Sequence, residues 1–144
     1  MAENKVTETT RAIVAKLYDC FRADEWDGLA VMLDDDIDWS IEMSGELMPF
    51  CGPRRSPQQV VEALKGLKSA LEHVKYEQVF TIIEGERASV YLRAIVRDRQ
   101  SGRATAIDLC DLLQIKEGKL VWYREFLDTL SAAEQMAGGR ARFG

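Results

Sequence analysis

The sequence predicts an α+β domain in which three N-terminal helices pack against a strongly curved, mostly antiparallel sheet. Two observations lead to this fold class. Apolar residues at helical spacing dominate the first half of the chain, and strand-like segments joined by short turns fill the second half. Because helices do not alternate with every strand, an all-parallel sheet is excluded. A long curved sheet of this kind leaves a cone-shaped interior, which is a natural ligand site.

The helices are placed by periodicity and by capping residues. The first is predicted over 7–21, with an apolar face of Ile13, Val14, Leu17, Tyr18 and Phe21. A short second helix is predicted over 29–33, and the acidic run 34–36 that follows it is predicted to be a solvated turn. Ser56 and Pro57 are typical of a helix start, and the apolar face of this third helix is Val60, Val61, Leu64, Leu67 and Leu71.

The strands follow from alternation and turn residues. Ile37, Trp39 and Ile41 alternate with polar residues and predict a first strand, and the proline- and glycine-containing segment 48–53 predicts a loop. Further strands are predicted over 74–84, 88–97, 104–115 and 120–129. The turns between these four are short enough to require antiparallel hairpins. We expect a single domain over 1–144, with a core at about 7–131, one short helical turn after Ser131 and a loose tail at 137–144.

Composition excludes several function classes. The net charge of the 144 residues is −5, which argues against nucleic acid or an anionic membrane surface as the partner. The sequence has no apolar run near the ~20 residues of a membrane span and no apolar signal core at its start. We therefore expect a cytoplasmic protein. Cys20, Cys51 and Cys110 are far apart, and the single histidine, His73, has no nucleophile motif near it, so no metal or cofactor is predicted.

Three segments carry a family resemblance. They are 35–39 followed by 49–52, then 110–115 entering a tight hairpin at 117–119, and finally 122–128. Together they resemble the SnoaL-like polyketide cyclases, the ketosteroid isomerases and the limonene epoxide hydrolases of the nuclear transport factor two-like superfamily. The resemblance spans about residues 7–131 and implies the cone-shaped fold.

The resemblance also implies catalytic residues. Glu125 matches the acidic residue of the last strand that acts as a general acid or base, and Asp111 matches the carboxylic acid that donates a hydrogen bond to a substrate oxygen. Strand alternation places Tyr123 and Leu127 on the same face as Glu125, and Leu109 on the same face as Asp111. The alternatives are a structural ion pair between Glu125 and an arginine such as Arg93, and an exposed or dimer-facing position for Asp111.

Other positions depart from the family pattern. Ile95 stands where the epoxide hydrolases need an Asp after Arg93, so epoxide hydrolysis is disfavoured. The isomerase base on the first strand falls near Ser40, and the isomerase tyrosine of the first helix falls at Leu17, one residue before Tyr18.

The sequence thus predicts a pocket for a small hydrophobic ligand. The candidate catalytic residues are Glu125 and Asp111, and the candidate binding residues are Tyr18, Trp39, Arg93, Leu109, Tyr123 and Leu127. Met32, Met43 and Met48 either flank the mouth of this pocket or fill the core.

The outer sheet face, with Trp122, Phe126, Cys110 and Leu112, predicts a homodimer packed sheet to sheet. The leading function is a cofactor-free acid–base enzyme acting on a small hydrophobic carbonyl compound. The alternatives are a binding module without turnover and a scaffold domain whose interior is filled.

Overall fold

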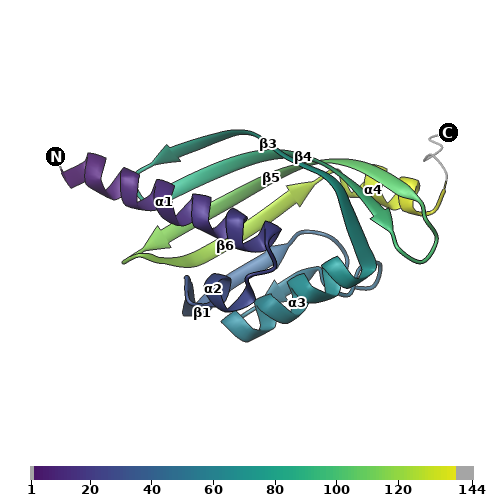
Figure 1. The fold of residues 1–144 in the computed structure, drawn as a ribbon, viewed down its shortest axis with the longest axis horizontal. Coiled ribbons are helices and arrows are strands. Elements are labelled where there is room, and N and C mark those ends of the chain that lie inside the picture. The colour runs from purple at the N-terminus through teal and green to yellow at the C-terminus, as the bar shows by residue number, and fades with distance from the viewer. Residues whose placement is uncertain (1, 139–144) are drawn as a thin grey trace.

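A computed structural model describes residues 2–138 and confirms the α+β class. The elements in chain order are α1 (Ala2–Arg22), α2 (Trp26–Ala30), β1 (Leu33–Ile41), β2 (Gly52–Arg54), α3 (Pro57–Ala70), β3 (Leu71–Glu84), β4 (Arg87–Asp98), β5 (Ala104–Lys116), β6 (Lys119–Leu127) and α4 (Thr129–Met136). The strands form one six-stranded sheet in the order β2-β1-β6-β5-β4-β3 (Figure 1).

The four long strands form the antiparallel meander that the short turns predict. β3 pairs with β4, β4 with β5 and β5 with β6, each antiparallel. β1 returns beside β6 in parallel, so the sheet is mixed. This parallel pair places Trp39 opposite Tyr123 and Ile41 opposite Glu125. Within the described residues, β1 and the last strand, β6, are therefore neighbours in the sheet, and most of the candidate residues lie on β1, β6 and β5.

Two segments differ from their predicted structure. Residues 34–36 belong to β1 and do not form a turn, although Asp35 and Asp36 remain exposed. A register shift between Leu33 and Asp38 lets the strand accommodate this acidic run. Within the predicted loop 48–53, Gly52 and Pro53 begin the edge strand β2, a position where proline costs no internal ladder hydrogen bond.

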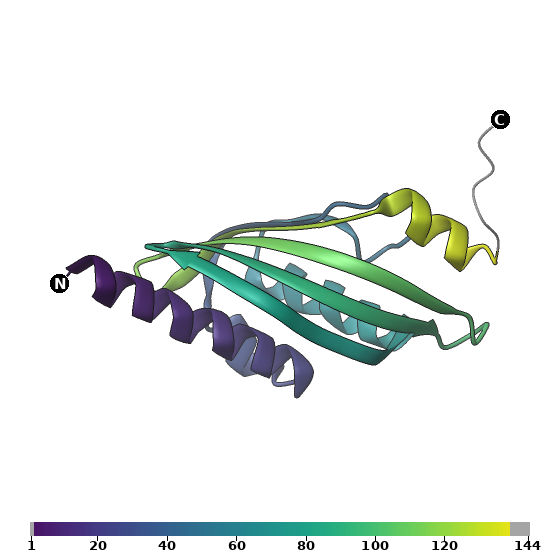
Figure 2. The same ribbon diagram turned by 90° about the horizontal axis from the view of Figure 1, so that it is seen from above.

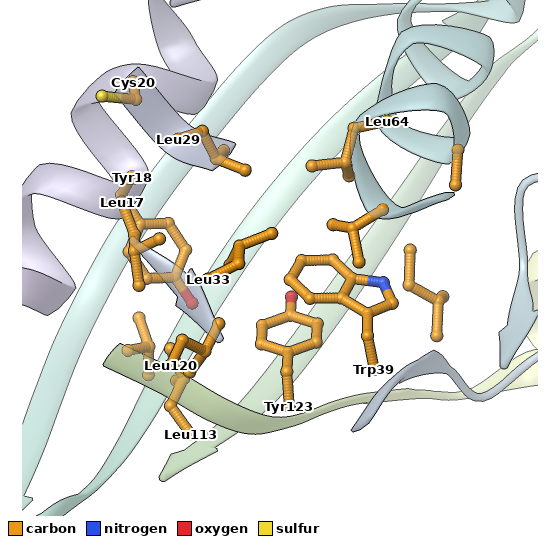
Figure 3. Close-up of a cluster of buried hydrophobic side chains, with 14 of the residues drawn as sticks. Leu17, Tyr18, Cys20, Leu29, Leu33, Trp39, Leu64, Leu113, Leu120 and Tyr123 are labelled. Atoms are coloured by element: carbon orange, nitrogen blue, oxygen red, sulfur yellow. The ribbon is translucent and has the colours of Figure 1, made fainter. Parts of the chain in front are cut away.

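Helices α1, α2 and α3 lie on one side of the curved sheet, and the opposite side is left bare over most of its area (Figure 2). Helix α1 is fixed at the β3–β4 turn. The Thr10 hydroxyl donates to the Gly85 carbonyl at 2.7 Å, and the Gly85 amide donates to the Thr7 hydroxyl at 3.1 Å. Tyr18 lies about two turns further along α1, and its buried side chain points toward the inner face of the sheet (Figure 3).

The core lies between these helices and the inner sheet face. Ser56 caps α3 as predicted, since its hydroxyl accepts from the Gln59 amide at 3.1 Å. Val60 and Leu64 of α3 and Val14 and Leu17 of α1 are buried against the strands. Figure 3 shows Leu64 of α3 near Trp39, while Leu17 and Tyr18 of α1 lie on the side of Leu113 and Leu120.

The chain leaves the sheet through α4. Strand β6 ends at Leu127, and the Asp128 carboxylate caps the next helix by accepting from the Ser131 amide at 3.0 Å. This helix of 8 residues is longer than the single turn predicted. The predicted tail at 137–144 falls mostly outside the described residues. Among residues 2–138, no helix has the length and apolar character needed to cross a membrane.

Candidate functional site

A mostly apolar cavity of about 90 Å³ lies between helices α1 to α3 and the inner face of the sheet. Its lining includes the predicted residues Tyr18, Trp39, Leu109, Tyr123, Glu125 and Leu127. This volume is smaller than the ~150 Å³ cavity that takes up benzene in an engineered protein. Met43 and Met48, whose unbranched side chains change shape at low cost, form part of the wall. The cavity is therefore too small for one aromatic ring as it stands, and a ligand of that size would require the Met43 and Met48 side chains to move.

The central polar feature is a pair of carboxyls on adjacent strands. Asp111 of β5 and Glu125 of β6 are directly opposite each other in the antiparallel ladder. Asp111 is 0% exposed and lies behind the cavity wall, whereas Glu125 lines the cavity. The Tyr18 hydroxyl donates to Oδ2 of Asp111 at 2.6 Å, and the Tyr123 hydroxyl donates to Oε1 of Glu125 at 3.2 Å.

The buried surroundings of these two carboxyls favour their protonated forms. Burial raises the pKa of Asp111 to about 6, and hydrogen bonds from Glu125 and the Tyr18 hydroxyl oppose part of that rise. Burial, followed by the charge of Asp111, raises the pKa of Glu125 well above its ordinary value. Oδ1 of Asp111 is buried and receives no hydrogen bond from an amide or hydroxyl of residues 2–138. Since the charge of Asp111 adds to the rise in the pKa of Glu125, Glu125 is the member of the pair that loses its proton last as pH rises.

Two aromatic groups form walls of the cavity. Trp39 of β1 and Tyr123 of β6 are stacked, with ring centroids 3.7 Å apart and planes at 12° (Figure 3). Phe21, His73 and Tyr76 form the second group, with centroid separations of 5.5 to 5.6 Å. Both groups line the cavity and offer flat surfaces to a ligand.

The second aromatic group also carries polar atoms. Burial, reinforced by the charges of Lys68 and Arg99, lowers the pKa of His73 to about 4, which leaves the imidazole neutral near pH 7. Burial and then the charges of Asp111 and Glu125 raise the pKa of Tyr76 well above its ordinary value. His73 and Tyr76 can therefore exchange hydrogen bonds with a ligand but bring no charge to the cavity.

Arg93 is not part of the site. Its guanidinium lies on the outer face of the sheet, where the side chain is 59% exposed and is 3.8 Å from Asp108. The prediction that Arg93 orients a ligand beside Glu125 is wrong, because β4 alternation sends Leu92 and Ala94 inward and Arg93 outward. The alternative of a Glu125–Arg93 ion pair fails for the same reason. The dimer-facing alternative for Asp111 fails as well, because that side chain is fully buried.

The first strand contributes no acid to the cavity. Ser40 is buried, but the Asp38 carboxylate pairs with Arg124 at 2.9 Å and with Arg55 at 3.1 Å. Glu42 is 3.6 Å from Arg124. These acids are engaged in ion pairs, so Glu125 is the carboxyl on which cavity chemistry depends.

Several cavity residues were missed by sequence reasoning. His73 and Tyr76 lie on β3, where register shifts between His73 and Lys75 and between Gln78 and Phe80 interrupt strict alternation. A pattern of period two cannot assign faces across such bulges. Cys51 and Met136 also line the cavity, and neither lies in a periodic segment of the predicted core. Burial raises the pKa of the Cys51 thiol to about 12, so it stays protonated.

Potential metal ligands do not cluster in the described part of the chain. Within residues 2–138, no group of three or more His, Cys, Asp or Glu side chains is arranged to hold a metal ion.

Comparison with known proteins identifies the family. The SnoaL-like domain family matches residues 14–123. This chain belongs to that family. The match contains α3, β3, β4 and β5 together with Tyr18 and Asp111, and it ends at Tyr123, two residues before Glu125. No curated protein matches the chain.

Solved structures share the fold. An NTF2-like protein from Burkholderia xenovorans LB400 is 24% identical, with a TM-score of 0.80 over 88% of this chain and 95% of that chain. TerC, co-crystallised with polyporic acid, is 17% identical, with a TM-score of 0.78 over 90% of this chain and 98% of that chain. A protein of ketosteroid isomerase-like fold from Catenulispora acidiphila DSM 44928, in complex with trimethylamine, is 11% identical. Its TM-score is 0.72 over 92% of this chain and 96% of that chain.

Proposed function

We propose that this SnoaL-like protein is a cofactor-free acid–base enzyme that moves a proton on a small hydrophobic carbonyl compound, as an isomerase or a cyclase does. The observation that carries the proposal is the Asp111–Glu125 pair beside an apolar cavity, with one carboxyl facing the cavity and the other buried behind it. The fold relationship to the TerC–polyporic acid complex supports a small organic ligand in this cavity.

The pair suits reversible proton transfer. Glu125 holds the proton at rest and faces the cavity, so it donates to the carbonyl oxygen of a bound ligand. Transfer of that proton leaves two neighbouring carboxylates in a dry site, an unfavourable state that favours return of a proton from an adjacent carbon. Asp111 does not reach the ligand in this scheme. It is a positioning residue that sets the proton affinity of Glu125 and is itself held by Tyr18.

Exchange of α-protons tests this proposal without knowledge of the natural substrate. We expect the wild-type protein to catalyse exchange of the methyl protons of acetophenone in D₂O, followed by proton NMR. Glu125→Gln keeps the size and polarity of the side chain but removes the exchangeable acid. It should lower the rate by about 10²- to 10⁴-fold, the usual contribution of a positioned acid–base group.

The matched control is Asp108→Asn on the outer face of β5. Asp108 is 65% exposed and is paired with Arg93, so its removal should leave exchange unchanged. Full exchange by a folded Glu125→Gln protein would remove Glu125 from the mechanism.

The second candidate function is a binding module without turnover. It is favoured by the engagement of Asp38 and Glu42, at the end of the first strand, in ion pairs, which leaves Glu125 as the one carboxyl among residues 2–138 that lines the cavity. Calorimetric binding of acetophenone without any α-proton exchange would support this function over catalysis.

We also propose a homodimer formed through the outer sheet face. Phe80, Ile82 and Phe126 are large apolar side chains exposed to between 46% and 60% on that face. Trp122 and Leu112 are partly exposed beside them. A second copy would cover these groups. Light scattering should give twice the chain mass of 16.3 kDa, and a mass of one chain would contradict the dimer.

A cytoplasmic location is proposed because the three cysteines are free thiols, which suits a reducing compartment.

A further inference from the structure

We infer that the indole N–H of Trp39 donates a hydrogen bond to the ligand and that the site takes a monocyclic compound with oxygen acceptors at opposite ends of its ring. One oxygen faces Glu125 and the other accepts from Trp39. This inference rests on the proposed function, because that function places the first oxygen at Glu125. It adds a binding residue and a substrate class to that function.

The first observation is an unpaired donor in the cavity wall. Trp39 is 6% exposed and lines the cavity, and within residues 2–138 its Nε1 atom is buried without a hydrogen-bond acceptor. A buried indole N–H usually finds an acceptor, and leaving this bond unmade lowers stability. A phenylalanine at the same position would provide a flat ring without the unpaired donor. An acceptor atom of a bound ligand would complete the hydrogen bond.

The second observation is that this donor is free at the ring edge and fixed in direction. Trp39 is stacked on Tyr123, with ring centroids 3.7 Å apart and planes at 12°. The N–H bond lies in the plane of the indole, so the stacked neighbour covers a ring face and leaves the edge open. The parallel pairing of β1 with β6 places the two residues opposite each other. The donor is therefore oriented before a ligand binds, which lowers the entropy cost of the bond.

The third observation is the separation of Trp39 from the acid. Trp39 is opposite Tyr123 and Ile41 is opposite Glu125, so Trp39 and Glu125 are two ladder positions apart, about 7 Å along the strands. The Tyr123 hydroxyl donates to Glu125 at 3.2 Å. Figure 3 shows this hydroxyl beside the six-membered ring of Trp39, and the indole nitrogen at the opposite edge, away from Tyr18. One ligand oxygen cannot use both donors, so a ligand that uses both needs two oxygens.

The size and lining of the cavity limit what separates these two oxygens. The cavity has a volume of about 90 Å³, and most of its lining side chains are apolar. A single six-membered ring with oxygens at its 1 and 4 positions holds them apart and places only carbon atoms against the apolar wall. A ring of this size already requires Met43 and Met48 to move, so a compound with several rings is disfavoured.

The substrate class is tested by isothermal titration calorimetry with three probes of one shape. The probes are 1,4-cyclohexanedione, 4-methylenecyclohexanone and 1,4-dimethylenecyclohexane, in which CH₂ groups replace first one and then both oxygens. The wild-type protein should bind the dione about five- to twentyfold more tightly than 4-methylenecyclohexanone. One hydrogen bond contributes about three- to tenfold of this ratio, and the two equivalent orientations of the dione contribute about twofold. A ratio of about twofold or less would overturn the second oxygen.

The residue assignment is tested with Trp39→Phe, which keeps an aromatic ring beside Tyr123 and removes the N–H. The preference for the dione over 4-methylenecyclohexanone should fall to about twofold. The hydrocarbon probe measures the effect of the smaller ring, which is common to all three probes. Trp122→Phe is the control, since Trp122 lies on the outer face under the Arg124 guanidinium at 4.8 Å, and it should keep the wild-type preference. Equal weakening of all three probes in Trp39→Phe would make Trp39 a wall residue only.

Nuclear magnetic resonance of the wild-type protein tests the same bond without reliance on the Trp39 variant. The chain has three tryptophans, so ¹H–¹⁵N spectra of Trp26→Phe and Trp122→Phe assign the Trp39 indole signal by elimination. The dione should move the Trp39 indole proton downfield, and 1,4-dimethylenecyclohexane should not. None of the probes is aromatic, so ring currents of the ligand do not contribute. A Trp39 signal that is already at a hydrogen-bonded position and does not respond to the dione would assign the N–H to a buried water and overturn the inference.

These outcomes separate the inference from the proposed function. If the wild-type protein exchanges the protons of acetophenone but shows no preference for the dione, the inference fails and the proposed function stands. If the dione binds through Trp39 but no exchange occurs, the binding assignment stands and catalysis fails. If none of the three probes binds, the substrate class is wrong, and exchange of acetophenone protons still decides the proposed function. Circular dichroism confirms that each variant is folded.

Discussion

The two faces of the β4–β5–β6 sheet place similar residues in opposite environments. On β5, Asp108 faces outward, is 65% exposed and pairs with Arg93, whereas Asp111, three residues later, is 0% exposed and receives a hydrogen bond from Tyr18. On β6, Glu125 lines the cavity while Arg124 pairs with Asp38 beside the neighbouring strand. Asp108 and Asp111 are the same residue type on one strand, so residue type alone does not predict which of them is buried.

The difference between the faces comes from access to water. An exposed acid is solvated and gains little from an ion pair. A buried acid must either be neutral or be held by donors, and Asp111 and Glu125 accept hydrogen bonds from the hydroxyls of Tyr18 and Tyr123. The same residue type is therefore a surface charge on one face and a candidate acid–base group on the other.

The largest contrast between the faces should appear in stability. Leu92 and Arg93 are adjacent on β4, and Leu92 is 0% exposed. Leu92→Ala removes buried methyl groups and leaves a cavity, so it should lower the free energy of unfolding by about 2 to 5 kcal/mol. Arg93→Ala on the exposed face should change it by at most about 0.5 kcal/mol.

Urea unfolding followed by circular dichroism measures both values. Comparable losses for the two variants would contradict the assignment of inner and outer faces. If the loss of stability in Arg93→Ala depends on protein concentration and the loss in Leu92→Ala does not, the outer face is an interface between copies of the chain.

The sequence was sufficient for the fold because the relevant signals are local. Short turns forced the antiparallel meander, and Ser56 with Pro57 marked the start of α3. Alternation on β5 and β6 correctly placed Leu109, Tyr123, Glu125 and Leu127 on one face, because the β5–β6 register there is regular. These features depend on neighbours in the chain and need no knowledge of tertiary packing.

Other features could not be derived in this way. Arg93 was placed in the site by family resemblance, although it falls on the outward parity of β4. Tyr76 follows a bulge that changes which side chains of β3 point inward, and a bulge has no clear signature in a single sequence. The hydrogen bond between Tyr18 and Asp111 joins α1 to β5, and such a contact depends on how the first helix is anchored at Gly85.

The difference between buried and exposed acids also predicts how the stability of the protein changes with pH. The pKa values of Asp111 and Glu125 are raised in the folded state, Asp111 from 3.8 to about 6. Between about pH 4 and pH 7 the unfolded chain therefore holds fewer protons than the folded one, so the contribution of this pair to stability is lost as pH rises. His73 acts in the opposite sense, because its lowered pKa of about 4 makes stability fall as pH drops from 6.5 to 4.

The double variant Asp111→Asn with Glu125→Gln separates these contributions. Relative to the variant, the wild-type protein should lose stability between pH 4 and pH 7, by about 3 kcal/mol from the shift of Asp111 alone, since one pKa unit corresponds to about 1.4 kcal/mol. In the variant the effect of His73 remains, so its stability should rise with pH over the same range, and His73→Phe should remove that rise. Urea unfolding at half-unit pH steps measures the profiles. Parallel wild-type and double-variant profiles would mean that the two carboxyls are ionised in the folded protein as they are in the unfolded chain, and the Glu125 proton on which the proposed chemistry depends would then be absent.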